Sequence, residues 1–330
     1  MAGCTRPIDA WFSKTRNPSG KRSVVFKRED AHIDMPVRIP CGKCPDCRLE
    51  KSRQWAVRIM HENDMHDDSC FITLTFDEDH LDPDYSLQVK DFQNFMKRLR
   101  KKLSKPFVYF NPTLGKEVTQ NPVKVRFFHV GEYGEQFGRP HHHAIIFGYD
   151  FPDKVVAGTL SPRSPFSLAG PNTAYVSSIL SELWAQGLHH IGSCTFESAA
   201  YVARYTLKKN YGEQAEEYYN YQDPETGRVI SRKPEFATMS RRPGIGAAWF
   251  ETYQSDIFPN GYVTSRDGIK MRVPRAYLKK LELTDPGLFR KMKAQMLKFA
   301  KENVVDSPEH LEACEYLTSQ RVSQLRRKLK

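Results

Sequence analysis

Residues 138–147 read Gly-Arg-Pro-His-His-His-Ala-Ile-Ile-Phe, three imidazoles that lead into an apolar run. Successive side chains of an extended strand point to opposite faces, so His141 and His143 share one face and His142 points the other way. The apolar residues that follow indicate that this strand is buried. Two imidazoles on one face are a suitable pair of ligands for a divalent metal ion. We therefore expect a buried strand that carries a metal site near its start.

A second informative stretch, Tyr-Val-Ala-Arg-Tyr, occupies residues 201–205. In a helix, Tyr201 and Tyr205 lie one turn apart on the same face. A phenol ionises near pH 10, so a tyrosine nucleophile needs a nearby cation or metal, and Arg204 and Lys208 could supply positive charge. An isolated pair with this spacing is usually ordinary helix packing. Combined with a metal site, it indicates chemistry on a phosphodiester.

The metal site needs a third ligand, and Glu132 is the favoured candidate. It lies in Gly-Glu-Tyr-Gly (131–134), which ends a strand expected over 123–130. That strand should pair with the histidine strand through the Gly-rich connection 131–138. A carboxylate suits Mg²⁺ or Mn²⁺. His129 and Glu135 are the alternatives.

The cysteines indicate a second metal site. Three of the seven form a Cys-x2-Cys-x2-Cys cluster, namely Cys41, Cys44 and Cys47. The first residues lack a secretory signal pattern, so we expect a reducing cytoplasm and no disulfides. A structural zinc ion normally has four ligands, which Cys4, His32 or His61 could complete, and Cys4 is favoured. The alternative is a turn with incidental thiols.

The overall composition favours a nucleic-acid partner. The chain has 330 residues, 39% of them hydrophobic, which is enough for a real core. Its formal net charge of +11 calls for a polyanion, either nucleic acid or an anionic membrane surface. No apolar run is long enough to span a bilayer. Nucleic acid is therefore the better expectation, with no membrane partner.

The spacing of apolar residues and the positions of glycine and proline predict a mixed order of helices and strands. In chain order we expect a basic helix over 48–61, a strand over 71–76, a helix capped by Ser86 and ending near 103, strands over 123–130 and 144–147, a loop over 151–172, a helix over 174–185, a strand over 190–196, a helix from 198, an unassigned segment over 210–246, and mainly helical, basic sequence to the end. The central strand-helix-strand-strand-helix order indicates an α+β domain rather than a doubly wound one.

Several of these segments together resemble the motifs of HUH endonucleases that start rolling-circle replication. They are 71–76 (Phe-Ile-Thr-Leu-Thr-Phe), 131–134, 138–143 and 198–205. The resemblance is strongest to the replication initiation proteins of microviruses, the gokushovirus type of single-stranded DNA phage. The segments 4–7, 40–44, 55–58 and 241–246 also resemble that family, so the similarity extends over nearly the whole chain.

The resemblance implies specific roles for the residues above. His141 and His143 would be the HUH metal ligands, with Mg²⁺ or Mn²⁺, and Tyr201 and Tyr205 the paired nucleophiles. It also implies an antiparallel sheet flanked by helices, with metal and tyrosines meeting on one face. His142 departs from the bulky hydrophobic residue expected between the two ligands, which leaves open which two of the three histidines bind metal. Strand alternation favours the outer two.

The implied activity is nicking of viral origin DNA, single-stranded or double-stranded, with a 5′-phosphotyrosine link and later cutting and rejoining of the displaced strand. The host polymerase would extend the free 3′ hydroxyl. No Gly-x4-Gly-Lys-Ser/Thr segment occurs in the sequence, so a host helicase would be needed. The expected location is the cytoplasm of the bacterial host.

We divide the chain into a Cys-rich, metal-stabilised segment (1–60), an HUH nuclease domain (61–210) and a basic C-terminal region (211–330) that binds DNA or packs on the nuclease domain. Two other functions fit parts of the sequence. One is a noncatalytic, zinc-stabilised DNA-binding protein, in which the histidines and tyrosines only pack or stack. The other is a plasmid relaxase or transposase that uses the same metal and phenol.

Overall fold

The computed structural model describes residues 4–18, 20–134, 138–160, 172–205, 213–222, 227–265, 268–303 and 307–325. The chain forms two compact units. The larger one comprises residues 52–290, and the smaller one combines residues 1–51 with residues 291–328.

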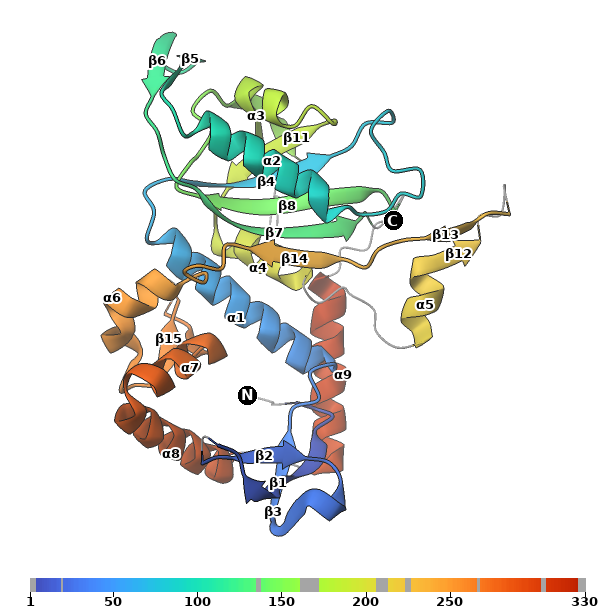
Figure 1. Cartoon of the computed structure of the whole chain (residues 1–330), viewed down its shortest axis with the longest axis vertical. Coiled ribbons are helices and arrows are strands. Elements are labelled where there is room, and N and C mark those ends of the chain that lie inside the picture. The colour runs from blue at the N-terminus through green and yellow to red at the C-terminus, as the bar shows by residue number, and fades with distance from the viewer. Residues whose placement is uncertain are drawn as a thin grey trace. The chain divides into compact units, whose positions relative to one another are not determined.

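A seven-stranded antiparallel sheet is the centre of the larger unit (Figure 1). Its strands, in spatial order, are β14 (Phe236–Met239), β7 (Arg126–Tyr133), β8 (Pro140–Phe147), β4 (Ser69–Thr75), β11 (His189–Ser193), β10 (Asn172–Val176) and β9 (Val155–Leu160). The expected strands 71–76, 123–130, 144–147 and 190–196 correspond to β4, β7, β8 and β11. The histidine strand β8 therefore lies inside the sheet, between β7 and β4.

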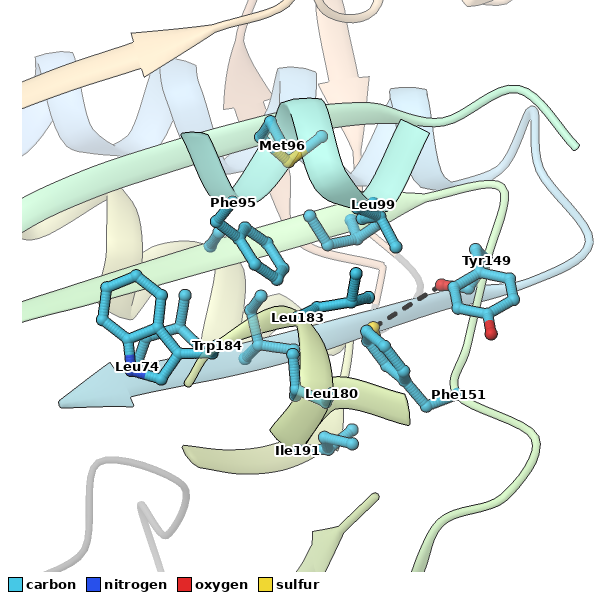
Figure 2. Packing of buried hydrophobic residues seen from close by; sticks show 14 of the residues in the cluster. Leu74, Phe95, Met96, Leu99, Tyr149, Phe151, Leu180, Leu183, Trp184 and Ile191 are labelled. Atoms are coloured by element: carbon cyan, nitrogen blue, oxygen red, sulfur yellow. Dashed lines mark hydrogen bonds between the residues drawn. The ribbon is translucent and has the colours of Figure 1, made fainter. Parts of the chain in front are cut away.

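One face of the sheet is covered by α2 (Val89–Lys102) and α3 (Ser178–Leu183). The labelled side chains of Figure 2 are part of this core, and they are Leu74, Phe95, Met96, Leu99, Tyr149, Phe151, Leu180, Leu183, Trp184 and Ile191. Burying each large apolar side chain contributes about 1.5–3 kcal/mol. This layer therefore stabilises one face of the sheet, and the residues of interest in the histidine strand lie on the other face.

The opposite face is covered by α4 (Phe196–Tyr205) and by the larger-unit part of α1 (Pro45–Asn63). Phe71 of β4 and Phe128 of β7 point to this side, as do Ile145 and Phe147 of β8. Strand β4 is buried on both faces, which explains why its sequence is almost continuously apolar.

Two local predictions were wrong. Ser86 does not cap α2, because the helix begins at Val89 with Gln88 as N-cap, and the Ser86 hydroxyl instead accepts a hydrogen bond from the Lys233 N–H. The helix expected over 174–185 is strand β10 followed by the shorter α3, whose N-cap Ser177 accepts from the Leu180 N–H.

The segments expected to be loop or unassigned also hold regular elements. Strand β9 lies within the expected loop 151–172. In the 210–246 segment the structure has α5 (Glu213–Tyr219), β12 (Asn220–Gln222), β13 (Val229–Ser231) and β14. The remaining elements of the larger unit are the hairpin β5 (Phe107–Asn111) and β6 (Lys116–Gln120), α6 (Ala247–Ile257), β15 (Tyr262–Thr264), β16 (Lys270–Arg272) and α7 (Arg275–Thr284).

The smaller unit contains a three-stranded antiparallel sheet in the order β2-β1-β3. These strands are β1 (Ile8–Arg16), β2 (Arg22–Val25) and β3 (Ala31–Ile39), with a short 3-10 turn, η1 (Arg28–Asp30), before β3. The unit also holds α9 (Pro308–Leu325) and most of α8 (Pro286–Asn303). Within it, Arg6 pairs with Glu315, and the Thr318 hydroxyl donates to Asp46.

The α+β class is confirmed, with a large antiparallel sheet, flanking helices and a cysteine cluster near the N-terminus. The expected strand-helix-strand-strand-helix order is present as β4-α2-β7-β8-α4, but β5 and β6 are inserted before β7, and β9, β10, α3 and β11 before α4. The functional division at residues 60 and 210 stays a prediction. Within the described residues, no helix has the length and apolarity needed to cross a membrane.

Candidate metal and tyrosine site

The pleat of β8 separates its three histidines. His143 pairs in register with Val130 of β7 and Thr73 of β4, and His141 pairs with Glu132 and Thr75. His141 and His143 therefore lie on the α4 face, and their rings stack with centroids 6.4 Å apart and planes 12° apart. Glu132 comes from β7 on the same face, one strand away.

His143 is held from both ring nitrogens. Its Nε2 lies 2.6 Å from Oε1 of Glu132, and its Nδ1 lies 2.8 Å from the Thr73 hydroxyl oxygen. The exposed fractions of His143 and Glu132 are only 2% and 5%. A carboxylate oxygen only accepts, so Nε2–H donates to Glu132 and Nδ1 accepts from the Thr73 hydroxyl. With a metal on Nε2, the proton would lie on Nδ1 and the Thr73 hydroxyl would accept it.

The backbone holds His141 in the tautomer that leaves Nε2 unprotonated. Its Nδ1–H donates to the carbonyl oxygen of Arg139 at 2.7 Å, so its Nε2 carries the lone pair. Burial lowers the pKa of His141, and the neighbouring His143 lowers it further. His141 is therefore neutral at pH 7, the form that binds metal.

Two imidazoles and a carboxylate are a mixed nitrogen and oxygen donor set for a divalent ion, and the carboxylate is the ligand that Mg²⁺ and Mn²⁺ favour. The ligand atoms of His141, His143 and Glu132 do not form a set with all spacings within 4.8 Å; among the described residues only the four clustered cysteines do. Of the alternative third ligands, His129 lies on the other face of the sheet, bonded to His142. Glu135 lies outside the described residues.

Helix α4 brings one tyrosine to the histidines. Its buried Ala199 and Val202 pack on the sheet, and the edge of the Tyr201 ring meets the His143 ring at a centroid distance of 5.4 Å. The Arg204 guanidinium lies 5.9 Å from the centre of the Tyr201 ring. Tyr205 is the last residue of α4, its side chain is not described, and Lys208 lies outside the described residues.

His142 occupies the α2 side of the sheet, where a bulky hydrophobic residue was expected. Its Nδ1 lies 3.1 Å from Nε2 of His129, whose Nδ1 lies 2.8 Å from the Thr238 hydroxyl. The His142 ring also packs against Phe76 and Trp184. Burial lowers the pKa of His142 to about 3, so this imidazole is neutral and serves as an apolar wall with one polar contact.

Two residues on the metal face were missed by the sequence analysis, Thr73 and His190. Thr73 bonds His143 of the neighbouring strand β8. On its other edge, β4 pairs with β11, where His190 is the register partner of Thr73. Directly opposed residues in antiparallel strands share a face, so His190 lies on the same face as His143. The position of Thr73 inside the apolar run of β4 could have indicated this contact. A buried threonine hydroxyl needs a polar neighbour to bond.

The second site gathers four cysteines. The ligand sulfurs of Cys4, Cys41, Cys44 and Cys47 all lie within 4.8 Å of one another, and the cluster could hold a metal ion. Backbone N–H groups of Lys43 and Cys44 donate to the Cys41 sulfur. The cluster therefore includes Cys4, as favoured, rather than His32 or His61.

One of these thiols is already easy to ionise. Burial by itself would raise the pKa of Cys44, but the nearby polar groups of Thr5 and Cys47 outweigh burial and lower that pKa to about 6. A thiolate is the form that ligates metal.

Comparison with known proteins identifies the family. A family model for replication-associated proteins of the ORF2 type matches residues 69–210, the segment from β4 past α4. Replication-associated protein VP4 of Bdellovibrio phage phiMH2K is 33% identical over 277 residues, which cover 83% of this chain and 75% of that protein.

Two further relatives carry related names. Replication-associated protein ORF2 of Spiroplasma virus 4 is 28% identical over 254 residues, 74% of this chain and 68% of that protein. Replication-associated protein ORF4 of Chlamydia phage 1 is 33% identical over 178 residues, 52% of this chain and 38% of that protein. No solved structure matches. The chain belongs to the family of phage replication-associated proteins, which confirms the microvirus-type resemblance drawn from its motifs.

Proposed function

We propose that this chain initiates rolling-circle replication of a phage genome by nicking one strand at the origin. The nucleophile is a tyrosine of α4, Tyr201 or Tyr205, and the metal ligands are His141, His143 and Glu132. The observation that carries the proposal is the meeting of Tyr201 with His143 on the sheet face where Glu132 bonds the same imidazole. Isolated tyrosine pairs are common in helices, but such a contact with a buried His–Glu pair is not required for packing.

The residues divide the work. A divalent ion, Mg²⁺ or Mn²⁺, would neutralise charge that develops on a nonbridging phosphate oxygen and would orient the phosphate for in-line attack. With the ion bound, the Thr73 hydroxyl and the Arg139 carbonyl would accept the Nδ1 protons of His143 and His141, which leaves both Nε2 atoms to ligate. Arg204 supplies positive charge beside the Tyr201 phenol.

The bond changes balance without a co-reactant. The tyrosine oxygen forms a bond to phosphorus, the bond from phosphorus to the 3′ oxygen breaks, and the phenol proton is lost while the 3′ oxygen gains one. The products are a 5′-phosphotyrosine and a free 3′ hydroxyl. The link conserves the energy of the phosphodiester, so a later attack by a 3′ hydroxyl rejoins the strand. Two tyrosines one turn apart can alternate between cutting and holding.

The wider cycle needs host proteins. A host polymerase extends the 3′ hydroxyl of the double-stranded replicative form, and a host helicase opens the duplex, since the chain carries no nucleotide-binding loop of the P-loop type. We place this activity in the cytoplasm of the bacterial host. We assign the nuclease role to residues 61–210 and a DNA-binding or packing role to residues 211–330.

We also assign a structural zinc ion to the cysteine cluster. Four sulfurs within reach of one ion match a closed, tetrahedral site with four thiolate ligands. The smaller unit has a small core, because its buried side chains among the described residues are Thr5, Ala10, Ser13, Ala31, Cys44, Met292 and Thr318. A unit with so small a core normally needs a metal or disulfide.

The test is a covalent-adduct assay. Labelled single strands that tile the genome encoding this chain are incubated with the protein and Mn²⁺, then denatured and separated on a gel. We expect one strand to give a protein–DNA adduct that chelation prevents. The adduct should be lost in the double variant Tyr201→Phe with Tyr205→Phe.

Tyr253→Phe is the matched control, because Tyr253 is an exposed phenol on another helix, α6, of the larger unit. The control should form the adduct at the wild-type level. Absence of any adduct with Mg²⁺ or Mn²⁺ would defeat the proposal, and so would an adduct that survives in the double variant. If Tyr253→Phe also lost DNA binding and the adduct, the loss in the double variant would not be specific to Tyr201 and Tyr205.

A further inference from the structure

The β1–β2 hairpin and the turn that follows it carry a cluster of positive charge, which ends at Glu29 and Asp30 of η1. Residues 13–28 contain six cations and no acidic residue, whereas the whole chain has a net charge of +11. The cations are Lys14, Arg16, Lys21, Arg22, Lys27 and Arg28. Five of them are exposed, and Arg22 is half-buried. Such a concentration of charge in one hairpin is far above the average of the chain.

Three of these cations are oriented by backbone carbonyls. The Lys14 ammonium donates to the carbonyl of Glu29, and Arg16 donates to the carbonyl of Gly20. Arg22 donates to the carbonyl of Ser13. A carbonyl acceptor positions a cationic side chain but carries no opposite charge, so these contacts leave the positive potential of the hairpin in place.

Aromatic and apolar groups accompany the charge. Phe26 directly follows β2 and is 59% exposed, and Val24 within β2 is 40% exposed. Trp11 of β1 lies under the Arg28 guanidinium at 5.9 Å. Lys and Arg side chains beside exposed aromatic rings are typical of surfaces that bind nucleic acid, because phosphates meet the cations and bases can contact the rings.

The cysteine cluster lies at the opposite end of this hairpin. Cys4 precedes β1 and Cys41 follows β3, and these two strands pair through Ile8 with Ile39. The cluster therefore joins the chain where β1 starts to the chain where β3 ends. The tip of the hairpin is a tight turn in which the Gly20 N–H donates to the Asn17 carbonyl at 2.8 Å.

The cysteine cluster, called the clamp below, holds the start of β1 to the end of β3, and the β1–β2 hairpin extends away from it. Strand β1 has nine residues, about 30 Å of extended chain, between the cysteine end and the turn. Few buried side chains hold the small sheet, so its direction depends on the clamp at its base. Beyond Ser13, which pairs with Ala31 of β3, strand β1 pairs with β2 alone, as in the pair of Arg16 with Arg22. This two-stranded tip is narrow enough to enter the major groove of DNA.

We propose that the β1–β2 hairpin is a DNA-binding ribbon, clamped at its base by the metal in the cysteine cluster, that grips phosphates of the bound duplex. The inference deepens the proposed function and rests on it in taking the bound polyanion to be origin DNA. The hairpin adds affinity for duplex DNA and takes no part in bond breaking.

The test measures binding of a short duplex of unrelated sequence by fluorescence anisotropy between about 50 and 200 mM salt. The hairpin variant carries Lys14→Gln, Arg16→Gln and Lys27→Gln. Each lost phosphate contact lowers the salt slope of the binding constant by about 0.9, so we expect the slope to fall by about 2 to 3 and binding to weaken by about tenfold or more. Zinc content and unfolding temperature report whether the variant is folded.

The matched control removes the same number of exposed charges from α8 of the same unit, with Lys291→Gln, Lys293→Gln and Lys298→Gln. We expect a clearly smaller change in slope. An unchanged slope in the hairpin variant would overturn the inference, as would an equal change in the control. Hairpin-dependent binding to phosphatidylserine vesicles without hairpin-dependent binding to the duplex would also overturn it.

Two further readouts separate this inference from its foundations. Zinc chelation should weaken duplex binding by the wild type and hardly at all by the hairpin variant; equal weakening of both would remove the clamp from the account. Nicking of a short single strand is measured with the wild-type protein as the second readout. If no strand is nicked but the hairpin variant still has a reduced salt dependence of duplex binding, the proposed function is wrong and the DNA-binding role of the hairpin is supported.

Discussion

Thr73→Val removes the hydroxyl that bonds the imidazole of His143, a proposed metal ligand, while keeping the size and branching of the side chain. The Thr73 hydroxyl lies 2.8 Å from Nδ1 of His143, and both residues are buried. Without the acceptor, a buried N–H has no partner when Nε2 binds metal, which costs about 1–3 kcal/mol. A middle value of about 2 kcal/mol corresponds to about thirtyfold weaker metal binding.

The assay is the rate of adduct formation as a function of Mn²⁺ concentration. We expect the half-maximal Mn²⁺ concentration to rise by about 10- to 100-fold, the usual effect of losing a partner of a metal-ligating histidine. The maximal rate at saturating Mn²⁺ should change much less, because the tyrosine and the phosphate are untouched. Thr73→Ser keeps the hydroxyl and should restore most of the metal affinity.

Thr75→Val is the matched control. Thr75 lies two residues along the same strand and the same face, but its hydroxyl donates to the Leu188 carbonyl at 3.1 Å. A half-maximal Mn²⁺ concentration in Thr73→Val equal to that of the wild type would refute the role assigned to Thr73. A rise of the same size in Thr75→Val would attribute the effect to the strand rather than to the hydrogen bond.

Three other outcomes follow from the described contacts. Glu132→Gln keeps a hydrogen-bonding group beside the buried imidazole but lacks the negative charge, so nicking at limiting Mn²⁺ should fall by about tenfold or more in the gel assay, and wild-type rates would contradict its role as a ligand. Cys44→Ser should lose the zinc that mass spectrometry finds in the wild type, whereas Cys314→Ser, outside the cluster, should retain it; equal zinc in both would exclude the four-cysteine site. Burial lowers the pKa of His61 from 6.5 to about 4, so the unfolded chain binds a proton at a higher pH than the folded chain does. The free energy of unfolding should therefore fall, by at most about 3 kcal/mol, as the pH drops from about 6.5 to about 4. In urea unfolding His61→Phe should flatten this dependence, and an unchanged slope would contradict the assignment.

The histidine strand could be predicted because one physical rule decides it. A buried strand alternates its side chains, so an apolar run after three histidines determines which imidazoles share a face. The partner strand followed from the intervening glycines. The actual contact of Glu132 could not be predicted, since it pairs in register with His141 but bonds His143 diagonally. That choice depends on side-chain rotamers, which the sequence pattern does not specify.

The helix predicted over 174–185 failed at its start for a reason of tertiary pairing. Tyr175 is paired with Ile191 of β11, and this added strand outweighs the helical spacing of the apolar residues that follow. The correct boundary had a signal, because Ser177 precedes the apolar residues 179 and 180 and is a good N-cap.

The small sheet of residues 8–39 was missed although its pattern was present. Ile33, Met35, Val37 and Ile39 alternate with polar residues and proline, which is the period of a strand. The same residues do not report a buried face, since Ile33 and Met35 are exposed. Alternation reveals the strand, but burial depends on what covers it, and the pattern alone does not contain that information.

Peptide mapping of the covalent adduct tests the central claim most directly. Trypsin cleaves after Arg204, so Tyr201 and Tyr205 fall in different peptides and can be told apart. After nicking, nuclease trimming and digestion, we predict that the peptide ending at Arg204 or the one beginning at Tyr205 gains the mass of a 5′-linked nucleotide, in a reaction that requires a divalent metal. Nucleotide mass on any other peptide, or strand cleavage that leaves both peptides unmodified, would contradict the account.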